Sequence, residues 1–351
     1  MSNINTGTQI RHALIKSSVW GAAAQAGAGH GIELTGQTLS HTIESIPDNS
    51  LGRPHLTGAD KGNTKVEGAL ESNARYADLL GLALVAGSSP APVASGTITY
   101  THTLTPADSV DGLHATFIEK RKSYTLESEL KPGGFTLYGE AGRAMSLRLA
   151  VSGFDIVEDS SVNTISTFAS VTIPDTGNRL LFADSVVRMN TASGAALGTG
   201  DVIYPNRIEF SYKRSLRGLY TGQYTVTRGQ VTTDRIDEPV NSGAAIVTLR
   251  LNFPSNSDAV LLTDFKADVA KKIDIVFTGR QIESGFNRKF SLEIPDARIT
   301  SMTVFDSSRG RLVQSAQFTA AIPASAPSGM SAITTPWRIK VTNTNSASYL
   351  A

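Results

Sequence analysis

The sequence predicts a mainly β protein made of two tandem β-sandwich or β-barrel units, each flanked by one α-helix. Three observations favour this fold class. Short runs of alternating apolar and polar residues dominate the chain, and Gly, Pro, Asn and Asp separate them. Helical periodicity is convincing in two stretches, one in each half. Both halves also follow one order: strand, loop, helix, then several strands.

The alternation is most regular at 97–105, where Ile98, Tyr100, His102 and Leu104 share one face of the expected strand. Further strands are expected over 31–43, 123–129, 136–139, 145–151, 207–213, 223–227, 245–253, 273–279, 289–294, 299–305 and 313–320. The Pro- and Gly-containing stretches 131–134, 295–296 and 307–310 are interpreted as turns between them.

The first expected helix covers 68–85 and has an apolar stripe. The second covers 258–272, with Ser257 as its N-cap, and Lys271 and Lys272 at the end where the helix dipole favours cations. Because each helix is apolar on one side, we expect each to lie on a sheet.

A short fragment supports an internal duplication. Each copy has a Ser-Leu pair, an arginine and a Thr-Gly pair: Ser50, Leu51, Arg53, Thr57 and Gly58 in one, Ser215, Leu216, Arg217, Thr221 and Gly222 in the other. Together with the shared element order, this predicts a first unit at 31–192 and a second at 201–322. The Gly- and Ala-rich stretch 193–201 is the expected link.

The two ends of the chain are expected to be arms. Residues 1–30 are rich in small residues and predict a flexible N-terminal arm, so deleting residues 1–20 should spare folding. Residues 323–351 predict a C-terminal arm with one short strand-like run. Each arm carries one of the two tryptophans, Trp20 and Trp337. Either each tryptophan packs on its own domain, or the arms dock on neighbouring subunits.

Composition narrows the class of protein. The net charge is +1, from 32 basic and 31 acidic residues, so a broad phosphate-neutralising surface is not indicated. With no cysteine, the chain has no disulfides, thiolate zinc sites or cysteine nucleophile. No apolar run approaches the ~20 residues of a membrane span, and the N-terminus lacks the apolar core of a signal peptide. We therefore expect a soluble protein, without a membrane partner, that stays in the cell that makes it.

Catalytic and cofactor signatures are missing from the sequence. All six histidines lie at or before position 114, without the spacing of a helical zinc site. The Gly-rich stretch 27–31 does not link a strand to a helix as a nucleotide loop does, and no Gly-x-Ser-x-Gly elbow occurs. The basic clusters at 119–122 and 213–217 are interpreted as edge or subunit-contact charges. We expect no enzyme activity, no cofactor and no metal.

Two stretches resemble a known family. The first runs from Ser45 to Arg53, continues through Gly62 to Leu70, and ends in the helical stretch 76–84. The second runs from Phe290 to Ser301 and on to the closing strand at 314–320. In this order they resemble the major tail tube proteins of long-tailed bacteriophages, over about residues 30–322.

The resemblance implies a structural role. Tail tube proteins pack two antiparallel sheets beside a helix, join their inner strands around a ring, and stack rings into a channel. The tape-measure protein fills that channel, and DNA later passes through it without specific binding. The expected location is the virion tail, after synthesis in the cytoplasm of the bacterial host. With two units per chain, three copies would form a pseudo-six-fold ring; without the duplication, six copies would be needed.

Subunit contacts are expected in the loops near 50–63 and 214–222 and in the arms. The residues chosen for these contacts are Trp20, Ser50, Leu51, Arg53, Ser215, Leu216, Arg217 and Trp337. Two alternatives stay open: another tail component that does not stack, such as a distal tail, hub or terminator protein, or a carbohydrate-binding β module. A hydrolase with an unrecognised carboxylate pair is the third.

Overall fold

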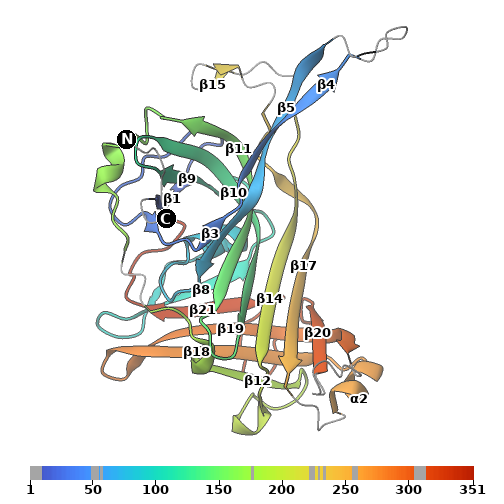
Figure 1. The fold of residues 1–351 in the computed structure, drawn as a ribbon. Helices are drawn as coiled ribbons and strands as arrows, with labels where there is room; N and C mark the ends of the chain where they lie inside the picture. Colours follow the sequence, from blue (N-terminus) through green and yellow to red (C-terminus); the bar gives the residue numbers. More distant parts are fainter. Residues whose placement is uncertain are drawn as a thin grey trace.

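The structure is a computed structural model. It describes residues 10–48, 55, 58–174, 178–220, 226–227, 230–231, 235–254, 260–303 and 314–351. The chain is mainly β, and its named strands pair antiparallel throughout, as the sequence predicts (Figure 1).

The elements of the first part of the chain are β1 (Arg11–Ser17), β2 (Gly31–Ile32), β3 (Gly36–Gln37), β4 (Ser40–Pro47), β5 (Ala59–Asn73), α1 (Leu80–Ala86), β6 (Gly87–Ser88), β7 (Val93–Ala94), β8 (Tyr100–Pro106), β9 (His114–Lys120), β10 (Thr125–Glu140) and β11 (Ser146–Glu158). Those of the rest are the 3-10 turns η2 (Thr167–Ser170), η3 (Phe182–Asp184) and η4 (Thr199–Asp201), then β12 (Ser185–Thr191), β13 (Val202–Ile203), β14 (Arg207–Arg217), β15 (Val226–Thr227), β16 (Gln230–Val231), β17 (Val240–Phe253), α2 (Val260–Lys266), β18 (Lys271–Glu283), β19 (Phe286–Thr303), β20 (Gln314–Ala320) and β21 (Arg338–Asn343).

The core lies between two crossing groups of strands. The long strands β10, β14 and β17 run steeply across β18, β19 and β21 (Figure 1). Trp337, just before β21, has no exposed surface and sits among the aromatic rings of Phe135, Phe210 and Tyr212. Aromatic rings bury the largest apolar areas per residue, so this cluster anchors one group of strands to the other.

Both expected helices are much shorter than predicted. Residues 68–73 belong to β5, because they form backbone pairs with β11 as far as Asn73. Lys271 and Lys272 belong to β18 and do not end a helix. Lys271 Nζ lies 2.6 Å from Asp264, and Lys272 Nζ donates to two backbone carbonyls. Ser257 lies outside the described residues. Pairing with a neighbouring strand outweighed the helical pattern at both sites.

Two of the expected turns are bends inside continuous strands. Pro132 lies within β10 and Pro295 within β19, and the pairing register shifts at or near both. Proline removes a ladder donor, which a strand tolerates at a bulge. The third, at 307–310, lies outside the described residues.

The expected N-terminal arm is wrong for the residues that the structure describes. Arg11–Ser17 forms β1, which pairs with β9 on one side and β2 on the other, and Ala13 is fully buried. The following residues cross the sheet as a strap, held where Ala24 and Ala26 donate to Thr116 Oγ1 and Asn163 Oδ1. The small residues that suggested flexibility let this segment lie close against the sheet.

The expected C-terminal arm is also wrong in its central part. β21 lies between β19 and β8 as an interior strand of the fold. Residues after it are tied down by polar contacts, as where Tyr349 donates to the carbonyl of Ala77 at 2.9 Å. The short strand-like run was predicted correctly, but its partners are more than 40 residues away in sequence and could not be inferred from it.

Candidate subunit-contact surfaces

The same pattern of strand pairing occurs twice in the chain. In the first set, β1 pairs with β2 and β9, β9 with β10, β10 and β5 with β11, and β4 with β5. In the second, β12 pairs with β13 and β18, β18 with β19, β19 and β17 with β20, and β14 with β17. The predicted duplication stays a prediction, and this repetition supports it.

The two hairpins agree residue by residue. In the first, Ile43 pairs with Thr64, and the register then shifts before Ser45. In the second, Lys213 pairs with Ile246, and the register shifts before Ser215. The paired positions differ by 170 residues in β4 and β14, and by 182 in β5 and β17, on both sides of the bulge. A one-residue slip would break this agreement, so the two hairpins correspond position by position.

The start of the second set differs from the sequence prediction. β12 was expected in the first unit, but it pairs with β18. The expected link at 193–201 therefore separates β12 from the strand with which it pairs. Pairing across 80 or more residues decides this membership, and a local composition shift does not report it.

The two sets share one eight-stranded sheet. Its order is β4, β5, β11, β10, β14, β17, β20 and β19, and the pairing of β10 with β14 joins the sets. Among the described residues, β4 has no partner on its outer side, and neither have the last residues of β19. Since neighbours alternate in direction over an even number of strands, the two outer strands run opposite ways. The two open edges are therefore complementary for antiparallel pairing between copies.

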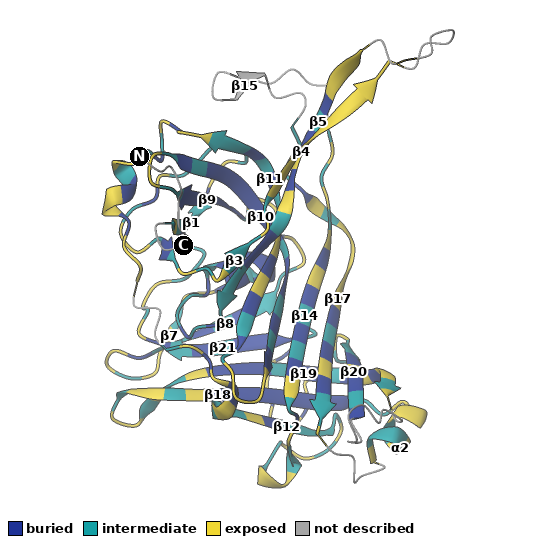
Figure 2. Cartoon of the chain, viewed as in Figure 1, coloured by how far each residue is buried: buried dark blue, intermediate teal, exposed yellow. Residues whose placement is uncertain are grey.

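The open edges carry exposed apolar side chains. All residues of β4 are exposed, including Ile43 and Ile46, on the hairpin that projects from the body (Figure 2). At the other end of the sheet, α2 has no buried residue, and Val260 and Phe265 are exposed. α1, by contrast, is almost entirely buried. Exposed apolar residues beside an unpaired strand mark an interaction surface.

The outward face of the sheet is polar and balanced in charge. Thr136 and Ser211 lie opposite each other across β10 and β14, with their hydroxyls 3.3 Å apart. Arg148 pairs with Glu71 at 3.4 Å, and on β14 Arg207 pairs with Glu209 at 3.0 Å. Exposed pairs of this kind contribute little to stability, so the face is suited to solvent or to a weakly held partner.

The predicted contact residues have different fates. Ser50, Leu51 and Arg53 lie outside the described residues. Ser215, Leu216 and Arg217 end β14, at the position that corresponds to the end of β4. Trp20 is partly buried and donates its indole N–H to the carbonyl of Ile236 at 3.0 Å. Trp337 cannot reach a neighbouring subunit, because its whole side chain is buried in its own chain. That expectation is wrong.

A row of buried charges escaped the sequence reasoning. Glu127, Glu129 and Lys131 alternate along β10 and lie under the strap. Glu129 accepts from Thr116 Oγ1 at 2.7 Å and contacts His114. Glu127 accepts from Asn163, and Lys131 pairs with Glu238. Alternating polar residues are normally assigned to a solvent face, so no local signal indicated their burial. With their partners engaged, they hold the strap and the start of β17.

Two titratable groups beside α1 are strained by burial. Burial raises the pKa of Asp78, just before α1, to about 6, although Arg75 lowers it in part. Arg214 of β14 is 5 % exposed, and burial lowers the pKa of its guanidinium. It donates to the carbonyls of Val85, Ala86 and Ala107 at 2.7–2.9 Å. The second set of strands thereby closes the end of the helix of the first.

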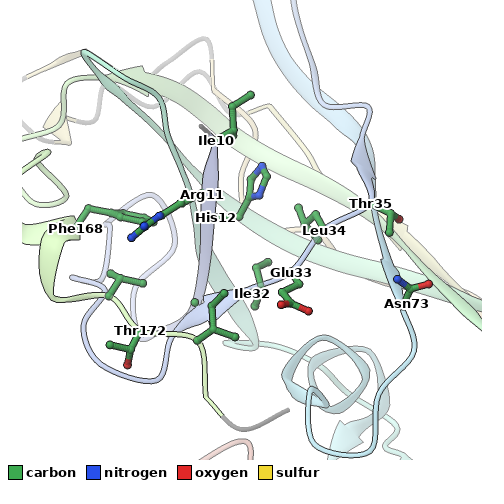
Figure 3. A pocket seen from close by; sticks show the side chains of 13 residues that line it. Ile10, Arg11, His12, Ile32, Glu33, Leu34, Thr35, Asn73, Phe168 and Thr172 are labelled. Atoms are coloured by element: carbon green, nitrogen blue, oxygen red, sulfur yellow. The ribbon is translucent and has the colours of Figure 1, made fainter. Parts of the chain in front are cut away.

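A groove of about 720 Å³ lies on the β1–β2 side of the chain (Figure 3). Arg11, His12 and Glu33 line it together with apolar residues. His12 lies 3.6 Å from Glu119, and Glu33 pairs with Arg75. Because these titratable groups are engaged by their own chain, the groove presents no free acid–base pair.

Metal and membrane features complete the description. In the part of the chain that the structure describes, no three His, Asp or Glu side chains gather closely enough to hold a metal ion. None of the described helices has the length and apolar character needed to cross a lipid bilayer. No protein-family model matches the chain, and a search of curated proteins finds no similar sequence.

Proposed function

We propose that the protein is a self-assembling structural protein that forms the tail tube of a long-tailed bacteriophage. Three copies would close a ring, and stacked rings would form the channel for the tape-measure protein and DNA. The observation that carries the proposal is the eight-stranded sheet with two open, complementary edges. No catalysis and no cofactor are part of this role.

The internal junction of the two sets supplies the geometry for the ring. Gly134 of β10 pairs with Lys213 of β14 inside the chain. The corresponding residues at the open edges are Met302 of β19 and Ile43 of β4, by the register of β20 and of the hairpins. Pairing these two edges between copies repeats the internal junction. Such a head-to-tail contact closes into a ring when its rotation divides the circle, and a duplicated chain then needs three copies.

The two hairpins favour stacking of the rings. β4 and β14 run in the same direction in the sheet, so both hairpins end on the same rim. The β4–β5 hairpin extends well beyond the body (Figure 1). The end of the second hairpin is fastened to the first, where Tyr220 donates to the carbonyl of Thr64. An exposed hairpin on one rim is suited to contact the next ring along the axis.

Electron microscopy of the purified full-length chain at high concentration tests the proposal. We expect rings or tubes with a central hole, and three-fold symmetry in averaged end views. Rings that do not stack would favour another tail component. Uniform particles without a hole, at every concentration tried, would refute the assembly and direct attention to glycan binding.

A further inference from the structure

The internal junction between the two sets is sealed by one side chain in a β-bulge. Arg214 is the extra residue where the register of β14 shifts. Its guanidinium reaches the end of α1 and donates to the carbonyls of Val85 and Ala86 at 2.8 and 2.7 Å. A cation at the C-terminus of a helix also complements the helix dipole. The bulge therefore aims a charged group of one unit at the helix end of the other.

A second contact lies two residues further along β14. A Cβ atom placed on Gly133 of β10 would lie 3.3 Å from Leu216 Cδ1. Leu216 thus covers the bend in β10, next to the point where Gly134 pairs with Lys213. The junction combines edge pairing, a bulge side chain on a helix end, and an apolar side chain over a strand bend.

The corresponding positions of β4 have no such contacts within the chain. Glu44 is the extra residue in the bulge of β4, as Arg214 is in β14. Ile46 corresponds to Leu216 by the same 170-residue difference. Both Glu44 and Ile46 are exposed, and Ile46 is 57 % exposed. The edge that would dock is present, but its docking site is not on the same chain.

The end of α2 is the corresponding docking site. α1 and α2 both have seven residues, and each begins seven positions after its hairpin strand ends. Phe265 and Lys266 therefore stand where Val85 and Ala86 stand in α1. Phe265 is 37 % exposed and Lys266 is exposed, whereas Val85 and Ala86 have no exposed surface.

The charges around α2 favour an acidic partner. Asp264 is engaged by Lys271 at 2.6 Å, and Asp268 by Arg298 at 2.6 Å. Lys266 extends the exposed surface at the last turn of the helix. Where the internal junction has an arginine against an uncharged helix end, the open edges have a glutamate and a lysine. The charge has been transposed, but the two surfaces remain complementary.

We propose that β4 of one copy docks on α2 and the end of β19 of a second copy, with Glu44 against Lys266. Ile46 then covers Ser301 and Met302, as Leu216 covers the bend of β10. This inference rests on the proposed self-assembly and names the surfaces through which it occurs. The occupant of the exposed face of α2 is a second copy of this chain.

Reversal of charge tests the pairing. Glu44→Lys and Lys266→Glu each place like charges together, so each should raise the concentration needed for assembly by about tenfold or more. The double variant should return it to within about threefold of the unmodified chain. Glu67→Lys is the matched control, because Glu67 is an exposed glutamate on the neighbouring strand of the same hairpin. Sedimentation and native mass spectrometry report the oligomer, and circular dichroism reports folding.

The outcomes separate the two proposals. If the unmodified chain does not assemble, the proposed function fails. If it assembles and the single reversals assemble equally well, the docking of Glu44 on Lys266 is refuted while the tube remains. If the single variants fail and the double variant is not rescued, the two residues do not face each other, and the pairing is again refuted. Rescue by the double variant, with the control unchanged, supports it.

Discussion

Truncation of Trp337 separates a core residue from a contact residue. The side chain is fully buried, and its ring lies 5.1 Å from that of Tyr212, 5.6 Å from that of Phe135 and 6.1 Å from that of Phe210. A tryptophan buries roughly 200 Å² of mainly apolar surface, which is worth ~5 kcal/mol at ~25 cal/mol per Å². Measured losses for such truncations are about 3–5 kcal/mol. We therefore expect Trp337→Ala to lower the free energy of unfolding by about 4 kcal/mol.

Thermal and urea unfolding of dilute, unassembled chain measures this loss. The expected fall in Tm is roughly 5–15 °C. Trp337→Phe should lose much less, because it keeps an aromatic ring and removes an indole N–H for which the described residues provide no acceptor. Tyr204→Ala is the control: this tyrosine is 79 % exposed, so its truncation should change stability by less than about 0.5 kcal/mol. If Trp337→Ala leaves Tm unchanged but abolishes assembly, the assignment to the core is refuted.

Three other perturbations have definite expected outcomes. Arg214→Met leaves three carbonyls beside α1 without their donor, so urea unfolding should show a loss of about 3 kcal/mol, and an unchanged midpoint would contradict the capping role. Asp78→Asn removes a carboxyl whose pKa is raised to about 6, so its ionisation penalises the fold as pH rises from 4 to 6. The variant should be more stable than the unmodified chain by about 2 kcal/mol at pH 8 and equal to it at pH 3. A gain that does not depend on pH would exclude burial of the charge as the cause. Deleting residues 1–20 removes β1, so limited proteolysis should show a largely unfolded first unit; a protease-resistant product would restore the arm interpretation.

The sequence by itself determined the fold class and much of the repeated order of elements. Period-two alternation follows from the geometry of a strand, so runs such as 245–253 were visible without a structure. The Ser-Leu fragment at 215–216 was found by comparison of the two halves, and it lies in the hairpin that corresponds to β4 and β5. These are local signals, and a local signal is what a sequence reports most directly.

The tertiary structure decided which strands are neighbours, and with that the candidate surface. A flexible-looking N-terminus became β1 because β9, about 100 residues away, pairs with it. Lys272 left its expected helix because backbone pairing with β12 and β19 outweighed the helical pattern. Trp337 and Ile46 are both large apolar residues near an end of a strand, yet one is fully buried and the other is 57 % exposed. Burial depends on contacts between residues far apart in the chain, and no periodicity of a single segment contains that information.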